Sequence, residues 1–384
     1  MSVIPHEKVL LPLRLEKSDY VGEVWGYFHP ETKIYNILAW DEDTRKRYAY
    51  LHLQPIGMIY GEGGSANKIR EQMNQLLGFR TESGLQFVVG DTLYKKEYYD
   101  LIQDVFSRNT GILETNWLME KKVCIIGGGS VGSLVAVELA RAGVGQFVLI
   151  DNDIMAYHNV CRHQCSIPDV GKYKAKALKE RILAINPMAK VFTYIDILEN
   201  LEKEAFDDHC TAGTVIVSCA DNREADVYAS RIANMYNVPF VSIGFWERAF
   251  AGEIFYFIPE EGMPCYECAI GTGTFASEAR PSMSRRFYTT QRNIENMNFE
   301  PGIAIDIDFV TLVGVKLILD IMNRNNPKFT PRVINYLTQF TLVCNTNDVR
   351  VGGDLAEIFA HPLQITSSIK VNFRDSCPPC KYRR

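Results

Sequence analysis

Hydrophobic and polar positions divide the chain into two parts near residue 120. Before that point, alternating segments at residues 24–28 and 48–53 predict strands, and turn residues such as those at 61–65 separate the predicted elements. Residues 67–77 are predicted to form a helix. We therefore expect residues 1–105 to form a small α+β module, and the pattern assigns no chemistry to it.

From residue 121 onward, apolar runs alternate with helical segments, which is typical of a mainly parallel sheet. The predicted strands lie at residues 123–126, 146–150, 215–218 and 240–243, and the predicted helices at 131–142, 173–185 and 223–236. Residues 249–258 and 333–343 alternate like antiparallel strands, and an apolar helix is predicted between them at 310–322. These elements predict an α/β domain over residues 106–384, with a mixed sheet that ends in an antiparallel part.

A glycine-rich turn, Gly127-x-Gly129-x-x-Gly132, lies between the first predicted strand of this domain and its first helix. Glycines in this context let the backbone approach a phosphate, and the helix N-terminus faces negative charge, so the turn predicts a nucleotide site in a Rossmann-like domain. Ser133 follows the last glycine, which excludes a Walker-type loop. Asp151 ends the next strand, where a carboxylate can bind ribose hydroxyls. These residues alone also fit an NAD enzyme, and a tight turn without a ligand is the structural alternative.

Charged and polar residues beyond the second strand favour ATP over NAD. Asp153, Asn159, Arg162 and Lys174 lie within one connection from strand to helix. A dinucleotide enzyme does not need cations there, whereas cleavage of a triphosphate does, because charge builds up on the phosphate oxygens. Asp221 follows a later strand and is a candidate Mg²⁺ ligand beside those phosphates. Taken singly, each residue fits a solvated surface charge, so the inference depends on their clustering at the strand ends.

Together these motifs resemble the ThiF/MoeB superfamily, which includes the ubiquitin-activating enzymes. The segments that carry the resemblance occur in the order seen in that superfamily: Gly127 to Gly132, Leu149-Ile150-Asp151-Asn152-Asp153, Asn159-Val160-Cys161-Arg162, Gly171-Lys172-Tyr173-Lys174 and Ser218-Cys219-Ala220-Asp221-Asn222. The resemblance covers roughly residues 108–380. Its motifs are specific as a set, although the glycine turn alone is not.

The resemblance implies ATP as the nucleotide and a role for each polar residue of these segments. Asp151 would bind the ribose, with Asp153 beside it. Asn159, Arg162 and Lys174 would contact the phosphates. Asp221 would hold Mg²⁺ near the α-phosphate.

An arginine before the first strand of the domain is a further candidate. Phe106-Ser107-Arg108-Asn109 resembles a superfamily segment whose arginine, in dimeric members, reaches the ATP of the other subunit. The resemblance therefore implies a homodimer with Arg108 acting in trans. The alternative is an ordinary exposed arginine.

Two C-x-x-C pairs, Cys265/Cys268 and Cys377/Cys380, together offer four thiolates to a tetrahedral Zn²⁺. Superfamily members carry a structural zinc of this type, and four protein ligands leave no open position for catalysis. A redox C-x-x-C is the alternative, but it would not need two pairs. We expect a structural zinc.

The remaining six cysteines bear on whether the chain forms a thioester. Superfamily members that do so place a cysteine in the crossover loop before the last apolar helix, and the corresponding residues 269–303 contain none. Cys124 and Cys219 are predicted to be buried, which leaves Cys161 and Cys165 as the outside candidates. Because nucleophilic catalysis needs an accessible thiolate near the acyl-adenylate, we expect the acyl acceptor to belong to a partner such as a conjugating enzyme.

Composition and charge narrow the class of protein. A net charge of −5 argues against a general nucleic-acid binder, which is normally basic. No apolar stretch is long enough to span a bilayer, and the first residues lack a signal-peptide pattern. A cytoplasmic location is expected, where the ten cysteines are thiols or metal ligands before disulfides.

The sequence therefore predicts an ATP-dependent adenylyltransferase. Its expected substrate is the C-terminal carboxylate of a small ubiquitin-like protein, in a pathway of the kind found in small bacterial conjugation operons. The alternative is an adenylase of the MccB type that modifies a ribosomally made peptide, which the empty crossover loop favours. A non-catalytic scaffold and an NAD oxidoreductase are weaker alternatives.

Overall fold

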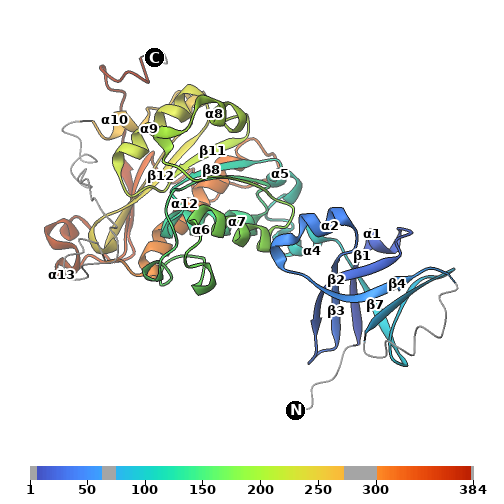
Figure 1. Cartoon of the computed structure of the whole chain (residues 1–384). Coiled ribbons are helices and arrows are strands. Elements are labelled where there is room, and N and C mark those ends of the chain that lie inside the picture. The colour runs from blue at the N-terminus through green and yellow to red at the C-terminus, as the bar shows by residue number, and fades with distance from the viewer. Residues whose placement is uncertain (1–6, 63–74, 272–300, 382–384) are drawn as a thin grey trace. The chain divides into compact units, whose positions relative to one another are not determined.

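The computed structural model describes residues 7–62, 75–271 and 301–381, and the chain divides into two compact units, Met1–Arg108 and Asn109–Arg384 (Figure 1). Most of the predicted helix at residues 67–77 and of the crossover loop at 269–303 lies outside the described residues. Each unit is described by itself below.

The first unit is a closed barrel in the strand order β1-β3-β2-β4-β5-β6-β7, with β7 pairing back onto β1 in parallel. Its strands are β1 (Lys8–Pro12), β2 (Gly22–His29), β3 (Ile34–Ala39), β4 (Gln54–Tyr60), β5 (Leu76–Thr81), β6 (Gly84–Val89) and β7 (Thr92–Tyr99). Its short helices are α1 (Leu13–Glu16), α2 (Glu42–Arg47), η1 (Ala49–Leu51), α4 (Leu101–Val105) and η2 (Ser107–Asn109). Residues that point into the barrel are buried, as the alternating Val9 and Leu11 of β1 show.

Two sequence expectations in this unit are corrected. The strand expected at residues 48–53 is instead a 3-10 turn, and β4 begins only at Gln54. The preceding helix α2 starts with a capping box between Asp41 and Thr44, and its end continues directly into that turn. Leu76 and Leu77, at the end of the expected helix 67–77, belong to strand β5.

The second unit has an eight-stranded sheet in the order β10-β9-β8-β11-β12-β13-β14-β15. The strands β10, β9, β8, β11 and β12 are parallel, and β13, β14 and β15 continue the sheet antiparallel. Their bounds are β8 (Lys122–Ile126), β9 (Gln146–Ile150), β10 (Lys190–Tyr194), β11 (Thr214–Ser218), β12 (Phe240–Phe245), β13 (Ala251–Phe257), β14 (Phe340–Cys344) and β15 (Ile365–Ile369). The predicted Rossmann-like mixed sheet with an antiparallel C-terminal part is confirmed.

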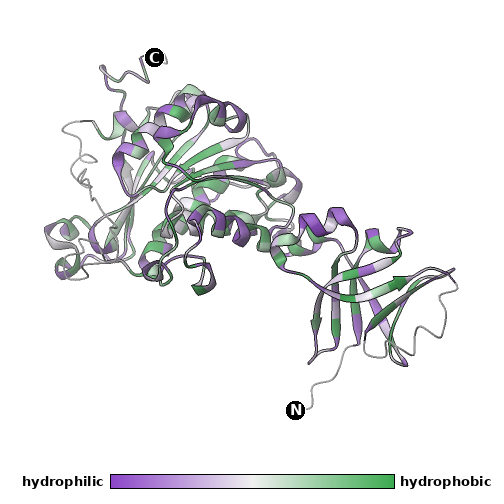
Figure 2. Ribbon diagram, in the orientation of Figure 1, coloured by the Kyte–Doolittle hydropathy of each residue, from purple (hydrophilic) through white to green (hydrophobic). Residues whose placement is uncertain are grey.

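Helices cover both faces of this sheet, so the central strands are hydrophobic on both sides (Figure 2). One core packs α6 (Ser130–Ala142), α7 (Lys174–Ile185) and α12 (Ala304–Asn323) against alternate strand residues such as Val123 and Ile125. The other core contains Cys124 and Ile126 with residues of α8 (Lys203–His209), α9 (Arg223–Met235) and α10 (Tyr266–Ala269). The shorter elements are α5 (Thr115–Met119), η3 (Tyr157–Asn159), η4 (Ile167–Asp169), η5 (Leu198–Asn200), η6 (Glu247–Ala249), η7 (Pro259–Glu261), α13 (Val349–Gly352) and η9 (Gly353–Ile358).

The antiparallel strand predicted at residues 333–343 is shorter in the structure, where β14 begins at Phe340. The buried carboxylate of Asp320 in α12 accepts hydrogen bonds from the consecutive amides of Arg332, Val333 and Ile334 at 2.7–3.1 Å. Amides held by one carboxylate are not available to a strand ladder, so pairing starts only farther along the chain.

Among the helices of residues 7–62, 75–271 and 301–381, none has the length and apolar character that a membrane crossing needs.

Candidate active site

A pocket of about 220 Å³ lies where strands β8, β9, β11 and β12 end, and residues from these strand ends line it. The sequence-predicted residues that line it are Gly127, Gly129, Asp151, Asp153, Asn159, Arg162, Lys174 and Asp221. Residues that are distant in the sequence therefore meet at one edge of the sheet, as open α/β sheets bring them together. Gly132 and Arg108 also lie in the described part of the chain, but they do not line this pocket.

Each glycine of the turn has a separate structural role. Gly127 has φ +85°, and a side chain there would also meet the backbone of Cys219. A Cβ on Gly132 would collide with the carbonyl oxygen of Gly127, so only glycine lets helix α6 pack so closely on the turn. A Cβ on Gly129 would meet nothing within 4 Å, which leaves open space at the pocket. Gly127 and Gly132 shape the turn, and Gly129 leaves room for a ligand.

Asp151 connects the glycine turn with the end of β9. Its Oδ2 atom accepts a hydrogen bond from the amide of Gly128 at 2.6 Å, and its Oδ1 atom accepts one from the amide of Asp153 at 2.8 Å. Burial raises the pKa of this carboxyl, while the charge of Lys174 and the two amides act against that rise. The carboxylate thus holds two neighbouring segments of the pocket in place.

Two cations of the pocket, Arg162 and Lys174, come from the connection after β9 and from the start of α7. Lys174 is the first residue of α7 and is buried, and its Nζ forms an ion pair with Asp153 Oδ2 at 2.8 Å. The Oδ1 atom of Asn159 accepts the amide of Ala156 at 2.9 Å and fixes the short helix η3. Arg162 lies one turn beyond it and lines the pocket.

A histidine that the sequence analysis passed over supports the glycine turn. His163 is buried, and its Nδ1 accepts the amide of Cys165 at 3.0 Å. The other ring nitrogen, Nε2, must then carry the proton, which it donates to the carbonyl of Gly128 at 2.7 Å. Burial lowers the pKa of His163, and nearby Lys174 lowers it further. Adjacency to Arg162 was the available signal, but no ligand spacing marked this residue.

Asp221 follows strand β11 and precedes helix α9. Asn222 caps that helix by accepting the amide of Ala225 at 2.7 Å, so the position of Asp221 is fixed by the helix start. The Asp221 carboxylate is exposed to the pocket, and no hydrogen bond or ion pair joins it to another residue in the described part of the chain. A carboxylate that is exposed to the pocket in this way could be a ligand of a cation bound together with phosphates.

A hairpin between β12 and β13 contributes further residues to the lining of the pocket. Arg248 and Ala249 have φ of +51° and +53°, which is the left-handed region that side-chain-bearing residues rarely adopt. Asn345 holds this turn, because its Nδ2 donates to the carbonyl of Ala249 at 2.7 Å and its own amide donates to Phe250. Trp246 and Arg248 both line the pocket from this hairpin.

The four cysteines of the C-x-x-C pairs lie together and are buried. Their Sγ atoms are all within 4.8 Å of one another, with 3.4 Å from Cys265 to Cys377 and 3.7 Å from Cys268 to Cys380. Sulfurs at the corners of a zinc tetrahedron are about 3.8 Å apart, given a Zn–S bond of about 2.3 Å. The amide of Arg374 points to the sulfur of Cys268 at 3.5 Å. The donor set and its spacing therefore fit a tetrahedral metal ion.

A buried polar network joins this cysteine cluster to the pocket. Tyr266, between two of the cysteines, donates its hydroxyl to Asp226 at 3.2 Å and accepts from Arg223 at 3.1 Å. Arg223 forms an ion pair with Glu253 at 3.2 Å, and Glu253 also accepts from the indole of Trp246. Arg223 follows Asp221 by two residues, so the network fixes the start of α9 from the side of the cysteines.

The other six cysteines differ in accessibility, and all of them lie in the described part of the chain. Cys161 is exposed, whereas Cys124, Cys165, Cys210, Cys219 and Cys344 are buried. Burial raises the pKa of Cys165 and Cys210 to about 12 and that of Cys344 to about 11. Buried thiols of this kind are poor nucleophiles, so Cys161 is the accessible one.

With this geometry established, comparison with known proteins identifies the family. The model of the ThiF family matches residues 105–349, which is more than half of the chain, and the chain therefore belongs to the ThiF family. This confirms the superfamily resemblance found in the sequence.

Individual relatives match a smaller part. The chain is 30% identical over 167 residues to ubiquitin-like modifier-activating enzyme 5 of Culex quinquefasciatus, which covers 41% of this chain and 42% of that protein. The enzyme of the same name in Caenorhabditis elegans is 28% identical over 159 residues, covering 39% of this chain and 38% of the relative. The chain thus spans about two fifths of the length of the curated relatives it matches.

Solved structures show the same fold. A crystal structure of E. coli MccB with MccA-N7isoASN has a TM-score of 0.51 and 19% identity, covering 72% of this chain and 74% of that one. A structure of E. coli MccB with AMPCPP and MccA has a TM-score of 0.50 and 19% identity, covering 73% and 75%. At this identity the likeness concerns the fold alone.

Proposed function

We propose that this chain is an ATP-dependent adenylyltransferase that activates the C-terminal carboxylate of a small ubiquitin-like protein. The observation that carries the proposal is the pocket in which the glycine turn, Asp151, Arg162, Lys174 and Asp221 meet in a chain of the ThiF family. The relatives in Culex quinquefasciatus and Caenorhabditis elegans, both ubiquitin-like modifier-activating enzymes, support ubiquitin-like protein activation as the class of reaction.

In the proposed reaction, a carboxylate oxygen of the substrate attacks the α-phosphorus of ATP. A bond forms between that oxygen and the α-phosphorus, which gives the mixed anhydride of the carboxylate with AMP, and the bond between the α-phosphorus and the bridging oxygen to the β-phosphate breaks. Pyrophosphate leaves with that electron pair. Negative charge shifts onto the phosphate oxygens, so preorganised cations stabilise the transition state more than the ground state.

We assign the chain's residues to this chemistry as follows. The open side of Gly129 gives the nucleotide phosphates access to the amides at the start of α6. Asp151 is the proposed ribose ligand, and Asn159 and Arg162 are proposed phosphate ligands. Lys174 is the second cation, held beside Asp153 until the phosphates are bound. The Trp246–Arg248 hairpin is the proposed place for the substrate's end.

Mg²⁺ fits the pocket because the Asp221 carboxylate is exposed there and pairs with no protein group among the described residues. Mg²⁺ is normally held by one or two carboxylates together with substrate phosphates. When bound there, it would neutralise charge on the leaving pyrophosphate. Asp221 would hold it, and Asn222 would keep that carboxylate in place by capping α9.

The acyl acceptor is proposed to belong to a partner, such as a conjugating enzyme. The loop at residues 269–303 contains no cysteine, and Cys161 is the accessible thiol. A thioester on Cys161 is therefore the alternative within this chain. An adenylase that modifies a ribosomally made peptide, as in the MccB type, is the second candidate function, and the cysteine-free loop favours it.

Assembly, metal content and location remain part of the proposal. Arg108 is exposed in η2, and we propose that it reaches the ATP pocket of a second copy in a homodimer.

We propose Zn²⁺ as the ion held by Cys265, Cys268, Cys377 and Cys380, on the sulfur spacing given above. We place the protein in the cytoplasm of a bacterium without a nucleic-acid or membrane partner.

Exchange of labelled pyrophosphate into ATP tests the proposal. Candidate substrates are small proteins that end in glycine and short precursor peptides encoded next to the gene for this chain. We expect exchange with one class only, dependent on Mg²⁺, and at least about 100-fold slower with Asp221→Ala. Glu224→Ala, which removes an exposed carboxylate from the first turn of the helix that follows Asp221, is the matched control and should exchange normally. If Asp221→Ala exchanges pyrophosphate as fast as the wild type, the proposed role of Asp221 is wrong. If the wild type binds NADH and shows no exchange with any candidate substrate, the proposed adenylation activity is wrong.

A further inference from the structure

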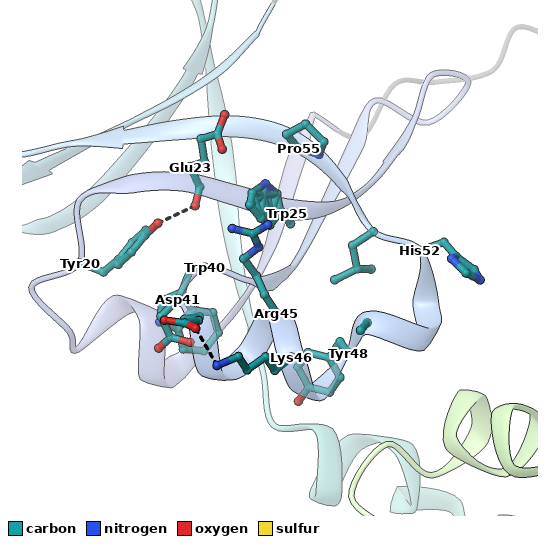
Figure 3. A pocket seen from close by; sticks show the side chains of 13 residues that line it. Tyr20, Glu23, Trp25, Trp40, Asp41, Arg45, Lys46, Tyr48, His52 and Pro55 are labelled. Carbon is teal, nitrogen blue, oxygen red and sulfur yellow. Dashed lines mark hydrogen bonds and ion pairs between the residues drawn. The ribbon is translucent and has the colours of Figure 1, made fainter.

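The barrel unit contains another pocket, of about 980 Å³, which shares no lining residue with the pocket proposed for adenylation (Figure 3). It lies between strand β2, helix α2 and the start of β4, entirely within residues 20–55. Four aromatic residues line it, namely Tyr20, Trp25, Trp40 and Tyr48. Pockets of this size that combine aromatic walls with a few polar groups are typical of ligand sites.

An arginine stacked on a tryptophan is the main polar feature of this pocket. The guanidinium of Arg45 lies 3.3 Å from the ring centroid of Trp25 (Figure 3). Stacking on the indole face holds the planar group in one orientation. No hydrogen-bond acceptor or ion-pair partner of the Arg45 guanidinium is found among residues 7–62, 75–271 and 301–381. A held guanidinium therefore presents its donors to the pocket.

The indole donor beneath it is also unsatisfied. Trp25 Nε1 is buried and has no acceptor in the described part of the chain. A buried donor without an acceptor costs about 1–3 kcal/mol, so an acceptor brought by a ligand would be favourable at this place.

The other charged groups of the pocket are engaged or directed elsewhere. Lys46 pairs with Glu42 at 2.6 Å, and Asp41 accepts the amide of Thr44 at 2.8 Å as the cap of α2. The side chain of Glu23 points away from Arg45 in Figure 3. Arg45 is therefore the cationic side chain of this pocket with which a ligand carboxylate can pair.

We propose that this pocket binds a peptide segment through one acidic side chain, whose carboxylate is clamped by Arg45 on Trp25. A carboxylate matches two parallel donors of the guanidinium, and the aromatic walls suit an apolar neighbour of the acidic residue. A ligand cation is disfavoured, because Arg45 already occupies the indole face. The more highly charged phosphate is disfavoured as well, because Asp41 and Glu42 lie on the same wall.

The test uses the full chain and blocked synthetic pentapeptides that carry a single central Glu, with Phe, Leu, Gly or Ser on either side. Each peptide has a partner with Gln in place of Glu, and acetate and inorganic phosphate are separate probes. Binding is measured by calorimetry and by tryptophan fluorescence. We expect at least one Glu peptide to bind about tenfold tighter than its Gln partner, as a charged hydrogen bond implies.

Substitutions in the pocket test whether Arg45 is the group that binds the glutamate carboxylate. Arg45→Gln should remove the preference for Glu, and Arg45→Lys should keep only part of it, since lysine lacks the planar fork. Arg47→Gln is the matched control, because Arg47 is exposed in the same helix and does not line the pocket. Trp25→Phe should reduce the fluorescence change caused by the peptide, and Trp40 in the same lining accounts for the part that remains.

The possible results separate this site from the adenylation site. Asp221→Ala should bind the Glu peptide as the wild type does, whatever its effect on pyrophosphate exchange. If no Glu peptide is preferred over its Gln partner by the wild type, the proposal is wrong, and this comparison needs no variant to fold. Phosphate or acetate binding as tightly as the peptides would also overturn it, because the pocket would then be a simple anion site.

Discussion

At the scale of single residues, the three glycines of the turn are needed for three different reasons. The backbone of Gly127 needs a positive φ, and helix packing leaves no space at Gly132. Gly129 has space for a side chain, and that space belongs to the pocket. Substitutions at Gly129 and Gly132 should therefore affect different properties.

We expect Gly132→Ala to lower the free energy of unfolding by about 1–3 kcal/mol, because the new Cβ would overlap the carbonyl oxygen of Gly127. Gly129→Ala, its matched control, should change stability by less than about 1 kcal/mol, since its Cβ meets open space. It should instead weaken ATP binding. Urea denaturation and equilibrium binding of ATP measure the two effects. A stable Gly132→Ala chain would contradict the packing argument.

His163 should make the second unit sensitive to acid. Burial lowers its pKa in the folded chain, whereas an unfolded histidine titrates near pH 6.5. Below about pH 6.5 the unfolded chain therefore binds a proton that the folded chain does not, and stability falls as the pH falls toward the folded pKa. We expect His163→Gln to reduce this slope in urea denaturation between about pH 5 and 6.5. His209, whose pKa is also lowered, keeps part of the slope in both proteins.

At the scale of elements, the hairpin after β12 is held in its left-handed conformation by a residue that directly follows another strand. Asn345 follows β14, is buried, and bonds the carbonyls of Ala249 and Asp306 at 2.7 and 2.9 Å. Strained backbone persists where surrounding contacts enforce it. The shape of this part of the pocket therefore depends on β14, far along the chain.

We expect Asn345→Ala to destabilise the second unit by about 2–3 kcal/mol, since two buried carbonyls lose their donor. It should also weaken substrate-dependent pyrophosphate exchange, because Arg248 loses its enforced position. Asn347→Ala, which removes one bond of 3.2 Å to Phe359, is the matched control and should cost about 1 kcal/mol. Thermal denaturation followed by tryptophan fluorescence checks both variants. Equal effects would mean that the hairpin does not depend on Asn345.

Some elements and site residues of this chain could be predicted from its sequence, and others could not. Buried strands such as β8 were predictable because both sheet faces are covered, which gives continuous apolar runs. The start of β14 was not, because Asp320 captures three amides from a distant position. Likewise, no local pattern marks His163 or the pairing of Arg45 with Trp25, since both depend on tertiary contacts. The motif residues around the pocket were predictable because parallel strands end at one edge.

At the scale of the whole chain, the cysteine cluster connects segments that are 112 residues apart. It ties residues 377–380 to the helix α10, and the hydroxyl of Tyr266 in that helix bonds Arg223 and Asp226 in α9. Cross-links that close long loops restrict the unfolded chain most, in the simple entropy model. A metal ion here would therefore support both the C-terminal segment and the start of α9 beside Asp221.

Removing that metal should affect stability and the pocket together. We expect about one zinc per purified chain by elemental analysis, and its loss after Cys377→Ser should lower the free energy of unfolding by several kcal/mol. Cys161→Ser is the matched control, because Cys161 is exposed and outside the cluster.

Tyr266→Phe should keep the zinc yet slow pyrophosphate exchange, since Arg223 loses one of its partners near Asp221. If Tyr266→Phe exchanges as fast as wild type, the cysteine cluster stabilises the chain without positioning the start of α9, and its link to the pocket is not functional.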